Sequence, residues 1–182
     1  MSDTADRYRA LAATLTHHVE AVPDDRWSSA SPCEGWTTRD VVGHLVDVHG
    51  MFLGHIGREI GPHPSVDDDP VAAWSAARDA TQRTLDDPVA ATTEYQGYFG
   101  PTTFEATMGR FGCFDLLIHG WDLARAAGLD DRLDPDEVRR TFAFAEGLGD
   151  SIRSASVCGP PIEPAPDADE QTKLLNFLGR SV

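Results

Sequence analysis

The sequence lacks most of the motifs that mark the commoner classes of enzymes. It has three scattered cysteines, Cys33, Cys113 and Cys158, and no C-x-x-C pair, which argues against a disulfide framework and against a zinc site built from thiolates. It also has no phosphate-binding glycine loop, no dinucleotide-binding fingerprint and no spacing typical of a Ser-His-Asp hydrolase. These absences leave histidine and carboxylate side chains as the main source of chemistry.

Basic residues and long apolar runs are also scarce. Thirty acidic residues outweigh fifteen basic ones and give a formal charge of −15, which argues against nucleic acid and anionic membranes as partners. No apolar run approaches the roughly 18 residues of a membrane span, and the N-terminus lacks the pattern of a signal peptide. We therefore expect a cytoplasmic protein that binds a small-molecule substrate, with a homodimer left open.

Apolar residues recur at helical spacing through most of the chain. Capping signals occur at Thr37 with Asp40, at Asp69 with Pro70, and at Thr102 with Glu105, and Gly128 is placed as a helix stop. The predicted helices cover about residues 4–22, 38–60, 70–85, 102–127, 134–148 and 170–178. Residues 89–101 fit either a long connection or an irregular hairpin.

These elements predict an all-α fold, an antiparallel four-helix bundle followed by an additional C-terminal helix and an extended tail. We expect one domain over residues 1–182. The bundle would cover about 4–128, and the C-terminal helix with the proline-rich tail about 134–182.

The segment FDLLIHGWDLARAAGL, residues 114–129, contains the pair most suggestive of a site. Asp115 and His119 are four residues apart, so both side chains lie on one face of a helix. A divalent metal completed by His44 from another helix would satisfy such a pair in an apolar setting. The alternative is a hydrogen bond between Asp115 and His119 inside a helical core.

Other polar residues near these positions have simpler interpretations. Asp122 shares the face of His119 and would either orient its imidazole or lie on the surface as a free acid. His49 and His55 are at poor spacings from His44 and are interpreted as core or surface residues. Cys33 and Cys113 have no recognisable base beside them, so a structural role is expected for both, and Trp121 is expected to serve packing.

Three segments resemble a known family: SPCEGWTTRDVVGHL at 31–45, FDLLIHGWDLARAAGL at 114–129, and the tail PIEPAPDADEQTKLLNFLGR at 161–180. They are similar to the DinB/YfiT-like metal-binding helix bundles, in particular the actinobacterial group related to the N-terminal domain of mycothiol-dependent maleylpyruvate isomerase. The resemblance implies a divalent ion bound by His44, Asp115 and His119. Such a ligand set suits zinc, with nickel or iron as alternatives.

The same resemblance implies a function that uses a small thiol. A metal-dependent thiol transferase or isomerase with mycothiol as cosubstrate is one expectation, and a non-catalytic small-molecule binding or stress-response module on the same bundle is the other. The isomerase has glutamate where this chain has Asp115, and it has a further C-terminal domain for which about fifty residues after Gly128 are too few. Its substrate is therefore not transferred to this chain.

Overall fold

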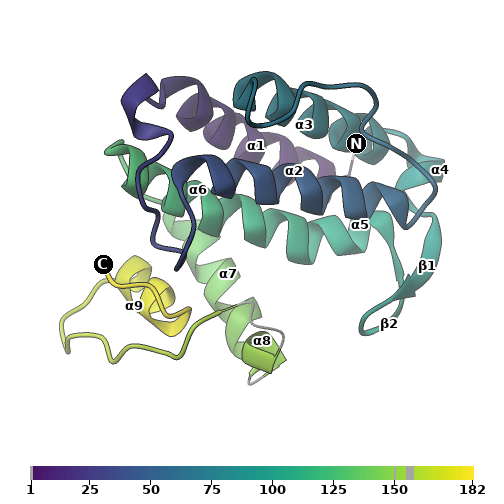
Figure 1. The fold of residues 1–182 in the computed structure, drawn as a ribbon. Helices are drawn as coiled ribbons and strands as arrows, with labels where there is room; N and C mark the ends of the chain where they lie inside the picture. The colour runs from purple at the N-terminus through teal and green to yellow at the C-terminus, as the bar shows by residue number, and fades with distance from the viewer. Residues whose placement is uncertain (1, 150, 155–157) are drawn as a thin grey trace.

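The computed structural model describes residues 2–149, 151–154 and 158–182. Helices dominate the chain, and a two-stranded hairpin interrupts them (Figure 1). In chain order the elements are α1 (Asp3–Ala21), η1 (Asp24–Arg26), α2 (Thr38–Gly54), α3 (Pro70–Asp86), α4 (Pro88–Ala91), β1 (Glu94–Gly97), β2 (Gly100–Thr103), α5 (Phe104–Thr107), η2 (Met108–Gly112), α6 (Cys113–Ala127), α7 (Pro135–Leu148), α8 (Ser151–Ser154) and α9 (Glu170–Phe177).

Four long helices form the bundle that the sequence predicted. Helix α1 packs against α3 and α6, and α2 packs against the same two helices, so the four enclose one core. Large buried side chains from each helix fill this core, and the fully buried ones include Tyr8, Leu45, Trp74 and Trp121. The all-α fold class is therefore confirmed.

Most helix ends follow from local signals in the sequence. The capping box at the start of α2 is present: the Asp40 backbone N–H donates to Thr37 Oγ1 (3.3 Å), and the Thr37 N–H donates to Asp40 Oδ2 (2.8 Å). Asp69 caps α3 through the N–H of Ala72. Gly128 ends α6 in the left-handed conformation with φ 75°, which a residue without Cβ adopts readily.

Two predicted boundaries are wrong. Helix α2 ends at Gly54 rather than near Ile60, because the chain turns at Gly57, which has φ 69°. The predicted cap at Thr102 lies in strand β2, and Thr103 caps the next helix instead. The segment left open at 89–101 contains α4 and the antiparallel hairpin, in which Gly97 pairs with Gly100.

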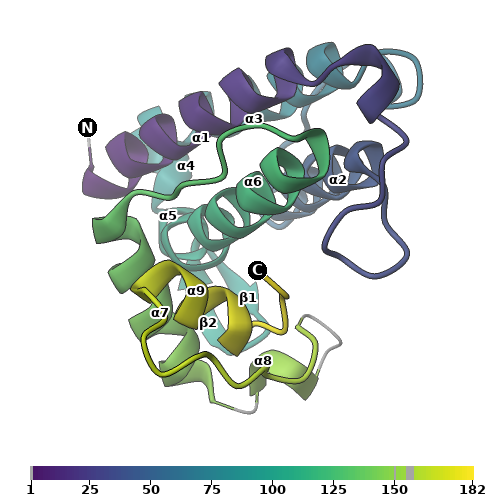
Figure 2. The ribbon, with the colours of Figure 1, turned by 90° about the vertical axis from the view of Figure 1, so that its left-hand side faces the viewer.

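The C-terminal part lies beside the bundle. Helix α9 packs along α7, as Figure 2 shows, and the chain then returns toward α6. Val138, Ile152 and Leu174 from this part join the hydrophobic cluster of the bundle. None of the helices in the described part of the chain is long and apolar enough to cross a membrane.

Candidate metal centre

Two neighbouring helices carry the three ligands that the sequence predicted. His44 lies in the first half of α2, and Asp115 and His119 lie on α6. The two helices pack together and run in opposite directions (Figure 1), so the start of α2 lies beside the second half of α6. This arrangement brings His44 to the α6 residues although about seventy residues separate them in the chain.

The structure places these side chains within reach of one cation. One ligand atom from each of His44, Asp115 and His119 lies within 4.8 Å of the others, and the two imidazole centroids are 4.7 Å apart. Metal–ligand bonds of about 2.0–2.2 Å put two ligands of one ion at most about 4 Å apart, so modest side-chain rotations are enough. The expected proximity is present, and metal binding itself stays a prediction.

Trp36 covers the two imidazoles from the loop before α2. Its ring lies 4.9 Å from the His44 centroid and stacks on His119 at 5.8 Å. The loop is a tight turn in which the Trp36 N–H donates to the Cys33 carbonyl (3.0 Å), with Gly35 at φ 78°. The turn therefore fixes an aromatic wall beside the candidate ligands.

Two of the three candidate ligands, His44 and Asp115, have no polar partner among the residues that the structure describes. Among the described residues, no hydrogen bond or ion pair to the Asp115 carboxylate or to either ring nitrogen of His44 is found. Both side chains are half-buried, and a carboxylate that is partly removed from water without a charged partner is unfavourable. A carboxylate and an imidazole that converge without partners fit a bound divalent cation.

The pKa values agree with this fit. Burial, reinforced by the neighbouring His119 and His49, lowers the pKa of His44 to about 4, so its imidazole is neutral and free to bind a metal at neutral pH. Burial raises the pKa of Asp115 to about 6, against the opposing effects of His119 and Arg180. A cation beside Asp115 would offset the unfavourable burial of its negative charge.

Asp122 orients His119 from the next turn of α6. Its carboxylate is fully buried, and Oδ2 lies 2.9 Å from His119 Nδ1. Burial raises the pKa of Asp122, but hydrogen bonds from His119 and Arg180 outweigh it and hold the pKa at about 2. An ionised carboxylate only accepts hydrogen bonds, so Nδ1 of His119 donates this one, and Nε2 is the ring nitrogen left to bind a metal.

A second group of possible ligands shares His119, and it is already satisfied. Cys33, His119 and Asp122 offer ligand atoms within 4.8 Å of one another. The Cys33 thiol donates to Asp122 Oδ2 (3.2 Å), and the Arg180 guanidinium donates to both Cys33 Sγ (3.6 Å) and Asp122 Oδ2 (2.7 Å). A fixed positive charge disfavours a cation there, so the group with Asp115 and His44 is the better metal site.

Cys33 itself is a poor nucleophile in this setting. Burial and the nearby Asp122 carboxylate raise the pKa of its thiol to about 12, against the effect of Arg180. The thiol therefore stays protonated at neutral pH and acts as a hydrogen-bond donor. This agrees with the structural role expected from the sequence, although the position of Cys33 beside the site was not foreseen.

The remaining candidates lie away from the centre. His49 is fully buried against Trp74 and Tyr8, and its Nδ1 lies 2.6 Å from the Leu45 carbonyl oxygen of its own helix. His55 stacks on Tyr95 of the hairpin. Both therefore have the packing or surface positions that the sequence suggested.

Cys113 and Trp121 are fully buried, so Trp121 packs in the core as expected. The charges that act on the pKa of the Cys113 thiol are those of Arg7, Glu137 and Arg140, not those of the candidate ligands.

Neither Arg180 nor Trp36 was among the site residues predicted from the sequence. Arg180 follows the last helix, more than fifty residues beyond Asp122. Its one available signal was its place at the end of the tail motif that resembles the family. No local pattern pairs an arginine in a tail with an aspartate in a distant helix.

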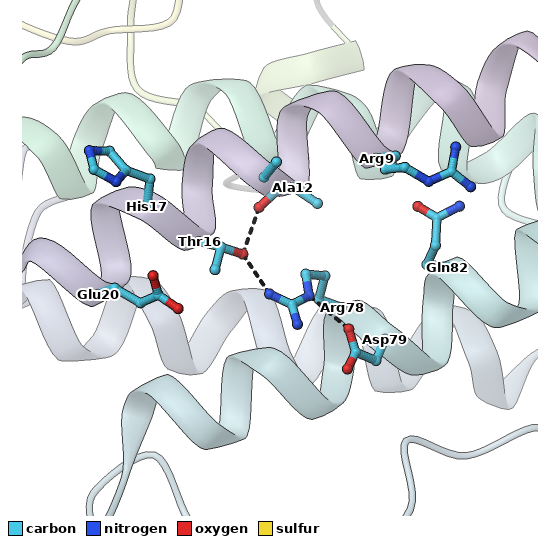
Figure 3. Close-up of a pocket in the computed structure, with 9 residues that line it drawn as sticks. Arg9, Ala12, Thr16, His17, Glu20, Arg78, Asp79 and Gln82 are labelled. Carbon is cyan, nitrogen blue, oxygen red and sulfur yellow. Dashed lines mark hydrogen bonds and ion pairs between the residues drawn. The ribbon is translucent and has the colours of Figure 1, made fainter.

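A surface groove on another side of the bundle is lined by none of the candidate ligands. The groove, of about 410 Å³, lies between α1 and α3 (Figure 3). In it, Arg78 is bound by Asp79 (2.8 Å) and by the Thr16 hydroxyl (3.1 Å). The charge of Arg78 in this groove is therefore already paired, and the groove's described residues present no cluster of unpaired metal-binding atoms like that around His44 and Asp115.

The fold is a four-helix bundle that brings two imidazoles and one carboxylate together between α2 and α6. The model of the mycothiol maleylpyruvate isomerase N-terminal domain matches residues 8–124, which is most of the chain, and the protein belongs to this family. The match covers all three candidate ligands and ends before the C-terminal part.

Two relatives from Mycobacterium tuberculosis are similar to the chain, and both are described only as uncharacterized proteins. One, from strain H37Rv, is 29% identical over 175 residues, which cover 95% of this chain and 93% of the relative. The other, from the same strain, is 28% identical over 141 residues, 66% of this chain and 55% of the relative. No solved structure gave a significant match.

Proposed function

We propose that the protein binds one divalent metal ion through His44, Asp115 and His119 and uses it to activate a small thiol of the mycothiol class for transfer or isomerisation. The observation that carries the proposal is the convergence of an unpartnered, partly buried carboxylate with two imidazoles, within 4.8 Å. The family supports the thiol, because the enzyme after which its domain is named depends on mycothiol.

The donor set favours zinc. Two imidazoles and one carboxylate are ligands that zinc accepts in catalytic sites, and nickel and ferrous iron tolerate the same set. Three protein ligands leave a coordination position for water or substrate. The His119 side chain is 12% exposed, so the site is not sealed from solvent.

The chemistry that a divalent ion supplies when bound is a lowered pKa for a coordinated thiol, which holds the thiol as a nucleophilic thiolate. The protein's own residues prepare that position. Asp115 supplies the negative charge that attracts the ion, and Asp122 fixes the proton of His119 on Nδ1. Trp36 excludes water from one side of the imidazoles and offers an apolar wall to a substrate.

The proposal is tested in two stages on the full chain. Metal analysis of protein purified without chelator should find one ion per chain, and His119→Ala should lose it while the helical circular dichroism is kept. The zinc-loaded protein should then accelerate the reaction of mycothiol with a small electrophile, and Asp115→Asn should lose this rate. Metal binding with no thiol-dependent reaction would favour the non-catalytic binding module instead.

A further inference from the structure

We propose that Arg180 is a positioning residue of the metal centre, which fixes the His119 imidazole by holding the Asp122 carboxylate. The inference rests on the proposed metal function. It extends the centre beyond the family match at residues 8–124 and assigns a role to the C-terminal segment.

The contacts form a continuous chain from the tail to the ligand. Arg180 Nε donates to Asp122 Oδ1 (2.8 Å), and its Nη2 donates to Asp122 Oδ2 (2.7 Å). The same Oδ2 accepts from His119 Nδ1 at 2.9 Å. Arg180 is 6% exposed and Asp122 is fully buried, so water screens this charge pair weakly.

The two-point contact fixes the plane of the Asp122 carboxylate. A carboxylate held at one oxygen can rotate about its bond to Cβ, whereas a guanidinium that binds both oxygens prevents this rotation. Oδ2 is then aimed at His119 Nδ1, which sets both the tautomer and the direction of Nε2. Without Arg180, the carboxylate would keep only the weaker donors Cys33 and His119.

Backbone contacts around Arg180 hold it in a fixed position beside Asp122. Helix α9 ends at Phe177, and Gly179 follows in the left-handed conformation at φ 81°. A Cβ on Gly179 would lie 2.9 Å from the backbone of Gly159, so this close approach requires glycine. The Arg180 N–H donates to the Leu175 carbonyl (2.9 Å), and the Asn176 side-chain amide donates to the Arg180 carbonyl (2.9 Å).

A double-mutant cycle on the full chain tests the route through Asp122. Zinc affinity is measured by competition with a chromophoric chelator for the parent, Arg180→Ala, Asp122→Asn and the double variant. We expect Arg180→Ala to weaken zinc binding roughly 10–100-fold, the usual effect of removing an outer-shell partner. When Asp122 is already asparagine, Arg180→Ala should alter the zinc affinity by less than about 2-fold, because Arg180 then has no Asp122 carboxylate through which to act on His119.

A second measurement distinguishes a positioning role of Arg180 from a general loss of stability. The visible absorption of the cobalt-substituted protein reports ligand geometry, and we expect Arg180→Ala to shift it. Arg153→Ala is the matched control: Arg153 donates to the Phe177 carbonyl (2.8 Å) and lies over the Phe177 ring, so it anchors α9 without touching Asp122. It should lower the thermal stability and leave the cobalt spectrum unchanged.

Arg180→Lys covers the case in which Arg180→Ala does not fold, since lysine keeps the charge and loses the two-point geometry. An intermediate loss of zinc affinity is expected for it. Equal zinc affinity and an unchanged cobalt spectrum in the parent and the folded Arg180 variants would overturn the inference while the metal site stands. A loss of the same size in the Asp122→Asn background would also overturn it. A parent that binds no zinc would overturn the proposed function, and this inference with it.

Discussion

Helix α2 carries two histidines whose surroundings differ in one decisive respect. His44 faces α6, where a carboxylate and a second imidazole lie within 4.8 Å, and its ring nitrogens have no hydrogen-bond partner among the described residues. His49, five residues further on, is fully buried between Tyr8 and Trp74 and has no carboxylate beside it in the described part of the chain. Its Nδ1 lies 2.6 Å from a carbonyl oxygen of its own helix, and its Nε2 is buried without a hydrogen-bond partner there.

Burial alone therefore does not identify a ligand. Both histidines have pKa values lowered to about 4, with burial as the main cause in each case. The difference lies in the neighbours: His44 has an unpaired carboxylate nearby, and His49 has aromatic rings. We infer that an unpaired carboxylate beside two imidazoles is the feature that separates a candidate metal site from a packed core.

Alanine substitutions should separate the two histidines most strongly. His44→Ala should abolish stoichiometric zinc binding and change the unfolding free energy of the metal-free protein little. His49→Ala should keep zinc binding and lower the unfolding free energy by about 2–4 kcal/mol, because it leaves a cavity in the core. Zinc titration and chemical denaturation of both variants provide the check, and the reverse pattern would contradict the comparison.

Acid should destabilise the core through His49. Its pKa of about 4 in the folded protein is below the ordinary value of 6.5, so the unfolded chain takes up the proton first as the pH falls. Stability that is present above pH 6.5 is then lost progressively toward pH 4, by up to about 3 kcal/mol.

The parent and His49→Gln should be compared without metal by urea unfolding at several pH values. The variant should show a shallower loss over this range. Identical pH dependence in the two proteins would show that His49 does not contribute.

Asp115 should have the opposite effect to His49: it should lower the stability of the metal-free protein as the pH rises. Its pKa is raised to about 6, so above that pH the folded protein holds a charge that the unfolded chain accommodates better. Asp115→Asn should therefore stabilise the metal-free protein at pH 7 by up to about 3 kcal/mol and weaken zinc binding. Calorimetry in the presence of chelator measures the first effect, and lower stability of the variant would count against the unpaired carboxylate.

The length of the side chain at position 115 provides a further test of whether Asp115 binds the metal. Asp115 is one methylene shorter than the glutamate of the isomerase that the sequence resembles. If reach limits ligation, Asp115→Glu should tighten zinc binding, because the charge and the spacing from His119 are kept. Zinc titration of the Asp, Glu and Asn forms under one buffer condition decides this, and equal affinity of Asp115 and Asp115→Asn would remove Asp115 from the ligand set.

The smallest expected effect concerns the start of α2. Thr37→Ala removes the side-chain acceptor of the capping box and should lower the unfolding free energy by about 1 kcal/mol. Zinc stoichiometry should stay unchanged, since the first turn of α2 is held by packing as well. Loss of zinc from this variant would mean that the cap, rather than the core, positions His44.

Local signals account for most of what the sequence predicted. Capping at Thr37 and Asp69, the stop at Gly128 and the apolar spacing are decided by neighbours within one helical turn. The same spacing put Asp115 and His119 on one face. The third candidate ligand, His44, came from the resemblance and from the rule that bundles build sites between facing helices.

Features that depend on distant contacts were missed. Helix α2 was predicted too long because its end is set by a turn at Gly57, and the cap was placed one residue early because the hairpin extends to Thr103. Cys33 and Arg180 reach Asp122 only through the folded chain. Sequence spacing carries no record of such contacts, so the outer part of the site appears only in the structure.

The central claim, a metal ion shared by α2 and α6, is tested most directly by measuring zinc per chain in the parent and His119→Ala after purification without chelator. The account predicts one zinc per parent chain and none in the variant, with helical circular dichroism unchanged. Full retention of zinc by a folded His119→Ala protein would contradict it.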